Sequence, residues 1–171
     1  SAALLVELLL YTGLRPGEVL ALKWEYLDTD RGLLHLPDTK TGARTVPLST
    51  SALQLLKDAP RIDGNPWVLP GARKNTHLTN PNKPWGLIRE RAGLSEVHLH
   101  DLRHTFASWG VSGGSTLYVV GGILGHKQSS TTERYAHLSQ DPVKQATDRT
   151  AAEIAAAMEG REPAEVIELP R

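Results

Sequence analysis

Hydrophobic positions near the start of the chain form an almost uninterrupted block. Residues 4–11 are apolar apart from Glu7, a pattern that predicts a helix buried on most of its surface. Gly13 is suited to end this helix, and Pro16 is suited to open another. Because Arg15 precedes the proline, its backbone is pushed out of the helical region. The pattern therefore predicts two helices with Arg15 fixed at their junction.

Two short runs of strand-forming residues, 33–37 and 45–48, follow a turn-rich stretch. They predict an antiparallel hairpin with Lys40 at or near its tip. A short helix is expected over 51–57. Residues 60–84 are rich in Pro, Gly and Asn, which predicts a long loop.

Apolar residues recur at helical spacing in the second half of the chain. A helix is expected over 85–92, and one apolar helix face is then marked by Leu99, Leu102, Phe106 and Trp109. His100 and Arg103 are three residues apart, so they share a different face of that helix.

The apolar segment 117–124 contains Gly121–Gly122, and each internal glycine costs a helix about 1 kcal/mol relative to alanine. We therefore expect either that this helix starts late or that the region is mobile. Ser130 and Glu133 form a capping-box pattern, which places Tyr135 within the first two turns of another helix.

The elements are mostly helical with one small antiparallel sheet, so the expected fold class is α+β. A length of 171 residues suits a single domain. An Ala-rich helix is predicted over 150–158, ending at Gly160. We expect one domain over 1–150 and a C-terminal helix and tail over 151–171.

Composition narrows the class of protein without naming a partner. The chain has 40% hydrophobic and 22% charged residues, no cysteine, and 19 basic against 19 acidic residues. A net charge of zero gives no support to a nucleic-acid partner. Residues 153–171 hold five acids and two bases, which leaves residues 1–152 with a net charge of +3. The absence of cysteine fits a reducing cytoplasm, which is the expected compartment. The apolar run 2–10 is too short to cross a bilayer, so no membrane partner is expected.

Five short motifs contain residues that could act on a phosphodiester. They are TGLRPGE with Arg15, TKTG with Lys40, HLHDLRHT with His100 and Arg103, LGHKQSS with His126, and ERYAHL with Tyr135. Each has an ordinary structural alternative, such as a solvated lysine, a packed histidine or a buried tyrosine. His100 and His104 also have the spacing of a zinc-binding pair, but the chain has no HExxH motif.

Taken together, these residues make chemical sense. Two arginines can bind phosphate oxygens in bidentate fashion, and a histidine can add a further donor to the developing charge. A phenol has a pKa of about 10 and needs a base or positive charge to become a nucleophile. A lysine near the leaving oxygen can act as general acid. The set needs no metal or other cofactor.

The chain resembles the catalytic domain of the tyrosine recombinase, or phage integrase, family. The resemblance lies in five motifs and their order: TGLRPGE, TKTG, HDLRHTFAS, LGH and RYAHLS. The resemblance covers residues 4–140 and implies the tyrosine recombinase catalytic-domain fold. It implies that Tyr135 attacks a DNA phosphate to give a 3′-phosphotyrosine, and that Lys40 protonates the 5′-oxygen. It also implies that His100 moves the proton of the nucleophile, and that the phosphate is held by Arg15, Arg103 and His126.

The resemblance extends to neighbouring residues and partners. Glu18 is expected to support Arg15, and backbone contacts to DNA are expected from Arg44, Arg73, Lys74 and Lys127. Double-stranded DNA is the expected partner, with a tetramer of protomers on DNA and a monomer without it. The tail 151–171 would dock on a neighbouring protomer. Family members usually carry an N-terminal clamping domain, so the chain is expected to be a fragment of a bacterial or phage-encoded enzyme.

Two alternative functions remain open at this point. One is a catalytically silent DNA-binding module, and the other is strand cleavage like that of a type IB topoisomerase. The complete set of six residues argues against the silent module, and the short loops and the spacing between LGH and RYAHL favour a recombinase over a topoisomerase. Phage integration, transposition and chromosome resolution all use this chemistry, so the sequence does not choose among them.

Overall fold

The computed structural model describes residues 2–37, 42–138 and 142–158. Its α-helices are α1 (Ala2–Thr12), α2 (Pro16–Leu20), α3 (Thr50–Asp58), α4 (Asn82–Arg91), α5 (Leu99–Ser112), α6 (Leu117–Leu124), α7 (Ser130–Glu133) and α8 (Pro142–Met158). The strands are β1 (Leu27–Asp28), β2 (Leu33–Leu36) and β3 (Arg44–Pro47), and two 3-10 helices are η1 (Trp24–Tyr26) and η2 (Ala136–Leu138). The α+β class with mostly helical content is confirmed.

The three strands form one antiparallel sheet in the order β1-β2-β3. Leu34 lies opposite both Leu27 of β1 and Val46 of β3. The side chains of β2 alternate, with Leu34 and Leu36 buried and His35 exposed. The predicted hairpin is therefore correct. Strand β1 was not predicted, because two residues beside a turn carry too little pattern to be recognised.

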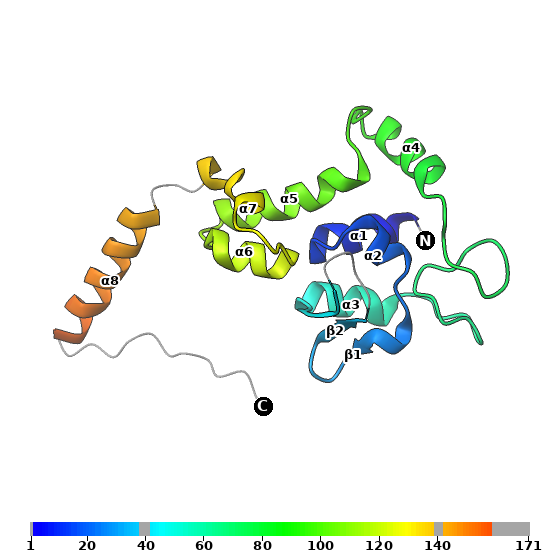
Figure 1. The fold of residues 1–171 in the computed structure, drawn as a ribbon, viewed down its shortest axis with the longest axis horizontal. Coiled ribbons are helices and arrows are strands. Elements are labelled where there is room, and N and C mark those ends of the chain that lie inside the picture. The colour runs from blue at the N-terminus through cyan, green and yellow to red at the C-terminus, as the bar shows by residue number, and fades with distance from the viewer. Residues whose placement is uncertain (1, 38–41, 139–141, 159–171) are drawn as a thin grey trace.

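The main hydrophobic core forms around α1. Leu5, Leu8 and Leu9 of this helix are at most 2% exposed, and they share the core with Leu34 of the sheet and Leu102 of α5. Figure 1 shows α3 and the strands on one side of α1 and α5 on the other, in agreement with the contacts of α1 with both helices. This arrangement fixes the α1–α2 junction against the middle of α5.

A second, smaller apolar cluster lies further along α5. Its members come from the C-terminal half of α5, from α6 and from the segment after α7: Ala107, Val111, Val120, Leu124 and Tyr135. The helix α6 begins at its N-cap Thr116, whose hydroxyl accepts from the backbone N–H of Val119. It runs through Gly121–Gly122 without a break. The expected late start is thus wrong, because the cap sets the start before the glycines.

Two further expectations from the sequence are corrected. Trp109 is 75% exposed and does not continue the apolar face of α5 into the core. The helix α7 ends at Glu133, so Tyr135 lies between α7 and η2 and not within a helix. Ser129, not Ser130, is the N-cap of α7, and its side chain makes no capping hydrogen bond. The capping-box pattern therefore did not place Tyr135 correctly.

The helix α8 stands apart from the α5–α7 group (Figure 1). It begins at Pro142, well before the predicted start near residue 150. Ile154 and Met158 are 56% and 83% exposed. Within the described residues, no helix combines the length and the hydropathy needed to cross a bilayer.

Candidate active site

Arg15 lies at the junction of α1 and α2, as predicted. Its backbone is extended, with φ −70° and ψ 146°, and Pro16 opens α2 directly after it. The carboxylate of Glu18 accepts from the backbone N–H of Arg15 and from its guanidinium, both at 2.9 Å. The side chain of Arg15 is thus held by the first turn of the helix that it precedes, and it stays 24% exposed.

Glu18 binds a second arginine, which comes from the sheet. Nη2 of Arg44 donates to Glu18 at 3.0 Å, and Nη1 donates to the carbonyl of Ile123 at 3.0 Å. Burial alone would raise the pKa of Glu18, but the N–H of Arg15 and the charge of Arg44 outweigh it and lower the pKa. Arg44, the first residue of β3, therefore ties the sheet to α2 and to the end of α6. Its guanidinium donates to protein groups, and the expected contact of Arg44 with the DNA backbone stays a prediction.

Arg103 is buried between the α1–α2 junction and α6. It is 4% exposed and donates to the carbonyls of Gly13 at 2.6 Å and Leu124 at 2.8 Å. Burial, followed by the charge of Arg15, lowers its pKa to about 10. Gly13 has φ +63°, and a Cβ there would come within 2.5 Å of Phe106. Only a glycine lets this junction approach α5 closely enough to meet Arg103.

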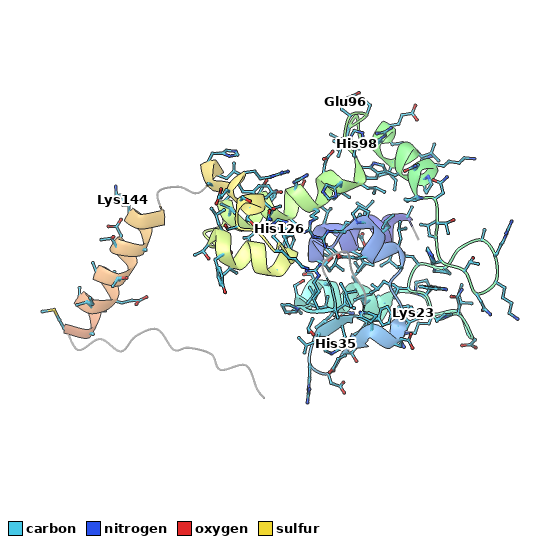
Figure 2. All side chains as sticks on the ribbon, in the orientation of Figure 1. Lys23, His35, Glu96, His98, His126 and Lys144 are labelled. Carbon is cyan, nitrogen blue, oxygen red and sulfur yellow. The ribbon has the colours of Figure 1, made fainter. Side chains whose placement is uncertain are left out.

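His126 follows the left-handed cap Gly125 at the end of α6. Its Nδ1 is hydrogen-bonded at 2.7 Å to the hydroxyl of Thr132, a buried residue of α7. Burial, followed by the charges of Arg103 and Arg15, lowers the pKa of His126 to about 4. Figure 2 shows His126 on the side of the α5–α7 group that faces α1 and α2. Its ring is therefore neutral near pH 7 and lies within the field of the two arginines.

Tyr135 belongs to the smaller apolar cluster and is 6% exposed. Its hydroxyl is hydrogen-bonded to Nδ1 of His104 on α5. The ring of His104 in turn meets the ring of His100 edge-on, with centroids 5.0 Å apart. Burial raises the pKa of Tyr135, while the charges of Arg134 and Arg103 oppose that shift.

A hollow of about 560 Å³ opens beside the tyrosine, and Trp109, Arg134, Tyr135 and Leu138 are part of its wall. A second hollow of about 710 Å³ lies between α6 and α7 and includes His126 and Lys127 in its wall. His126 and Tyr135 therefore each lie beside a hollow.

The charges of Arg15 and Arg103 act on His126, and the charge of Arg103 also acts on Tyr135. Tyr135 is linked to His100 through the ring of His104. Five of the six residues expected to be catalytic are connected in these ways. Lys40 lies outside the described residues. Arg73 and Lys74 are exposed in the connection between α3 and α4, which Figure 1 shows on the opposite side of the molecule from α6 and α7. Lys127 is exposed next to His126. The expected roles of these four cations stay predictions.

Sequence reasoning missed His104 and Thr132. The spacing of His100 and His104 suggested only a metal pair, whereas the partner of His104 is the tyrosine hydroxyl. Among the described residues, no group of three His, Asp or Glu side chains could hold a metal ion. The signal that could have found His104 is that it lies one helical turn after His100, so that both rings point along one helix face.

Two solved structures share this architecture. The Tn1549 transposon integrase, in complex with circular intermediate DNA, matches with a TM-score of 0.67 at 21% identity, over 85% of this chain and 58% of the other. The catalytic domain of bacteriophage HP1 integrase matches with a TM-score of 0.63 at 26% identity, over 85% of this chain and 79% of the other. The fold is that of a tyrosine recombinase catalytic domain.

The sequence comparison identifies the family. The profile of the phage integrase family matches residues 1–141, and the chain belongs to this family. Similar proteins include the shufflon-specific DNA recombinase of Escherichia coli, 35% identical over 77% of this chain and 33% of that protein. The tyrosine recombinase XerA of Pyrococcus furiosus is 33% identical over 85% of this chain and 53% of its own length. The chain thus spans from a third to about half of these relatives.

Proposed function

We propose that this chain cleaves and rejoins DNA strands through a 3′-phosphotyrosine intermediate, as part of a site-specific recombinase or integrase. The observation that carries the proposal is the group of Arg15, Arg103 and His126 beside a hydrogen-bonded tyrosine. Arg103 is buried among like charges, and Glu18 is the carboxylate whose charge acts on it. Burial is the main cause of the lowered pKa values of Arg103 and His126, and repulsion from neighbouring arginines adds to it. A phosphate bound there would offset that repulsion.

In the proposed reaction, Tyr135 attacks the scissile phosphorus and the bond to the 5′-oxygen breaks. Lys40 gives its proton to that oxygen, and Arg15 and Arg103 hold the non-bridging oxygens. A 5′-hydroxyl from another strand then attacks the phosphotyrosine and returns the enzyme to its starting state. Each step exchanges one phosphoester for another, so the cycle consumes no nucleotide cofactor.

The partners follow from this chemistry. Double-stranded DNA is the substrate, and the setting would be the cytoplasm of a bacterium or a phage-infected cell. Strand exchange requires several protomers on one DNA, which the family resemblance sets at four. Helix α8, with Ile154 and Met158 exposed, is available to dock on a neighbouring protomer within such an assembly.

The test uses duplexes with randomised sequence around one 5′-bridging phosphorothiolate. Attack by Tyr135 releases a thiol that rejoins poorly, so the protein stays linked to DNA and can be recovered after denaturation and sequenced. We expect a covalent adduct with the wild-type chain and none with Tyr135→Phe. Binding without any adduct would favour the silent DNA-binding module. An adduct that persists in Tyr135→Phe would refute the assignment of the nucleophile.

A further inference from the structure

The nucleophile has one direct polar partner in the described structure, and it is not a residue of the expected catalytic set. The hydroxyl of Tyr135 is hydrogen-bonded to Nδ1 of His104. His100, to which proton transfer was assigned, contacts the ring of His104 and not the hydroxyl. His100 is exposed, whereas His104 is half-buried and its ring centroid lies 6.0 Å from that of Tyr135.

From this contact we propose that His104 is the base that accepts the proton of Tyr135 when the tyrosine attacks the DNA phosphate. The inference rests on the proposed function and deepens it. It assigns a catalytic role to a side chain one helical turn beyond His100. His100 then acts on the nucleophile only through the ring of His104.

The proton balance of the step is complete. As the bond from Tyr135 Oη to phosphorus forms, the phenolic proton moves to Nδ1 of His104. As the bond from phosphorus to the 5′-oxygen breaks, that oxygen takes a proton from Lys40. The cleaved state therefore holds an imidazolium at His104 and a neutral amine at Lys40. Rejoining reverses both transfers, because the incoming 5′-hydroxyl protonates Lys40 and the departing phenolate regains its proton from His104.

The surroundings of His104 suit this role. A base must be unprotonated before the reaction, and burial, followed by the charges of His100 and Arg134, lowers the pKa of His104. The charge of Arg103 also lowers the pKa of His104, whereas the charge of Asp101 raises it. A neutral imidazole with its proton on Nε2 leaves the Nδ1 lone pair free to accept the O–H of Tyr135.

The position of His104 on α5 also matters for geometry. Arg103, the adjacent residue, is fixed by the carbonyls of Gly13 and Leu124. One helical segment thus supplies both a guanidinium for the phosphate and the base for the nucleophile. General bases placed in this way contribute about 10²–10⁴-fold to a rate.

The experiment compares His104→Asn with His104→Ala on the phosphorothiolate duplexes. The Asn side chain places an oxygen near the position of Nδ1, so it can hold the tyrosine hydroxyl but cannot take its proton. We expect both variants to lose about 10²–10⁴-fold in the single-turnover rate of adduct formation at pH 7. A single-turnover rate of His104→Asn within threefold of the wild-type rate would overturn the proposal and leave His104 as a positioning residue.

A pH profile adds a readout that a purely structural role would not change. The wild-type rate should rise as the imidazole loses its proton and then level off. The rate of His104→Asn should keep rising toward the pKa of the tyrosine, so that the two rates converge in alkaline solution. Parallel profiles would overturn the proposal. His77→Asn, in the connection between α3 and α4, is the matched control and should behave as wild type.

The thiolate leaving group separates the two proton transfers, because it departs without an acid. The rate of adduct formation by Lys40→Ala should therefore recover on these duplexes, whereas the rates of the His104 variants should not. A fourth measurement needs no variant: the ¹⁵N shifts of the His104 ring should show Nδ1 unprotonated, and a proton on Nδ1 would overturn the proposal. If the wild type forms no adduct, both the proposed function and this inference fall. If wild type and His104→Asn react equally, only the inference falls.

Discussion

The substitution Arg44→Met tests whether Arg44 holds the site together or contacts DNA. Methionine keeps an unbranched stem of similar length and removes the guanidinium. The side chains of Arg44 and Glu18 are only 13% and 8% exposed, so their ion pair is shielded from solvent. The variant loses the hydrogen bonds to Glu18 and to the carbonyl of Ile123, and it leaves Glu18 with Arg15 alone.

Hydrogen bonds to charged groups are worth about 1.5–3 kcal/mol each, so the two together give an upper bound of about 6 kcal/mol. Two features of the structure reduce this figure. Glu18 keeps its bonds to Arg15, and the buried Nε of Arg44 has no hydrogen-bond partner among the described residues, a cost that the variant removes. We therefore expect Arg44→Met to lower the free energy of unfolding by about 2–4 kcal/mol.

The assay is equilibrium unfolding in urea at pH 7, followed by circular dichroism. For a chain of this size the loss corresponds to a fall in Tm of about 5–15 °C. Arg31→Met is the matched control, because its side chain is 80% exposed and lies 4.0 Å from Asp28. It should change the free energy by less than about 0.5 kcal/mol. Unchanged stability of Arg44→Met together with weaker DNA binding would refute the structural role and restore the expected DNA contact.

The same variant carries a pH signature. The lowered pKa of Glu18 means that its charge stabilises the fold above the ordinary value of 4.5, and this contribution is lost as the pH falls through the lower folded-state value. Removing Arg44 moves the pKa of Glu18 back upward. The difference in stability between wild type and Arg44→Met should therefore shrink below about pH 4.5.

Three other perturbations test the remaining parts of the site. Gly121→Ala would bring a Cβ within 2.8 Å of the hydroxyl of Thr132, so it should destabilise the fold and weaken the hydrogen bond between Thr132 and His126. A Cβ at Gly122 meets nothing within 4 Å, so Gly122→Ala should stabilise the fold by up to about 1 kcal/mol. Equal melting temperatures for the two variants would contradict this packing. The pKa of His126 is lowered from 6.5 to about 4 in the folded state, so the unfolded state binds more protons between those pH values. The free energy of unfolding should therefore decrease as the pH is lowered from 6.5 to about 4. In His126→Asn, measured by unfolding at a series of pH values, this decrease should be absent. Arg15→Lys should lose most adduct formation although the charge is kept, because bidentate binding is lost, and near-normal rates in the single-turnover assay would count against the clamp.

Local patterns in the sequence were enough to predict the α1–α2 junction and the hairpin. Arg15, Pro16 and Glu18 are neighbours in the chain, so sequence alone predicts how they bind one another. The fold class and family also follow from motif order. In contrast, Arg44 was expected to contact the DNA backbone, and nothing in the sequence predicted its contacts within the protein. Its actual partner, the carbonyl of Ile123, lies far away in the sequence, and such contacts leave no local signal.

The same reasoning explains what the sequence did not predict about the helices. Glycines inside 117–124 suggested a weak helix, yet buried Gly121 lets α7 come close to α6. Trp109 continues the apolar spacing of α5, but no element of the described structure covers that position. His104 was recognised only by its spacing from His100. The identity of its partner depends on how the segment after α7 folds back onto α5, which tertiary packing decides.

The two apolar clusters have unequal size, and the tyrosine belongs to the smaller one. The main cluster joins α1, α3, α5 and the sheet, whereas the cluster of Tyr135 has five buried members. Regions with fewer buried contacts open at lower free-energy cost than the whole domain unfolds. Backbone amides of α6 should therefore exchange with solvent before those of α1. Heat would then release Tyr135 from its packing while most of the helical content is still intact.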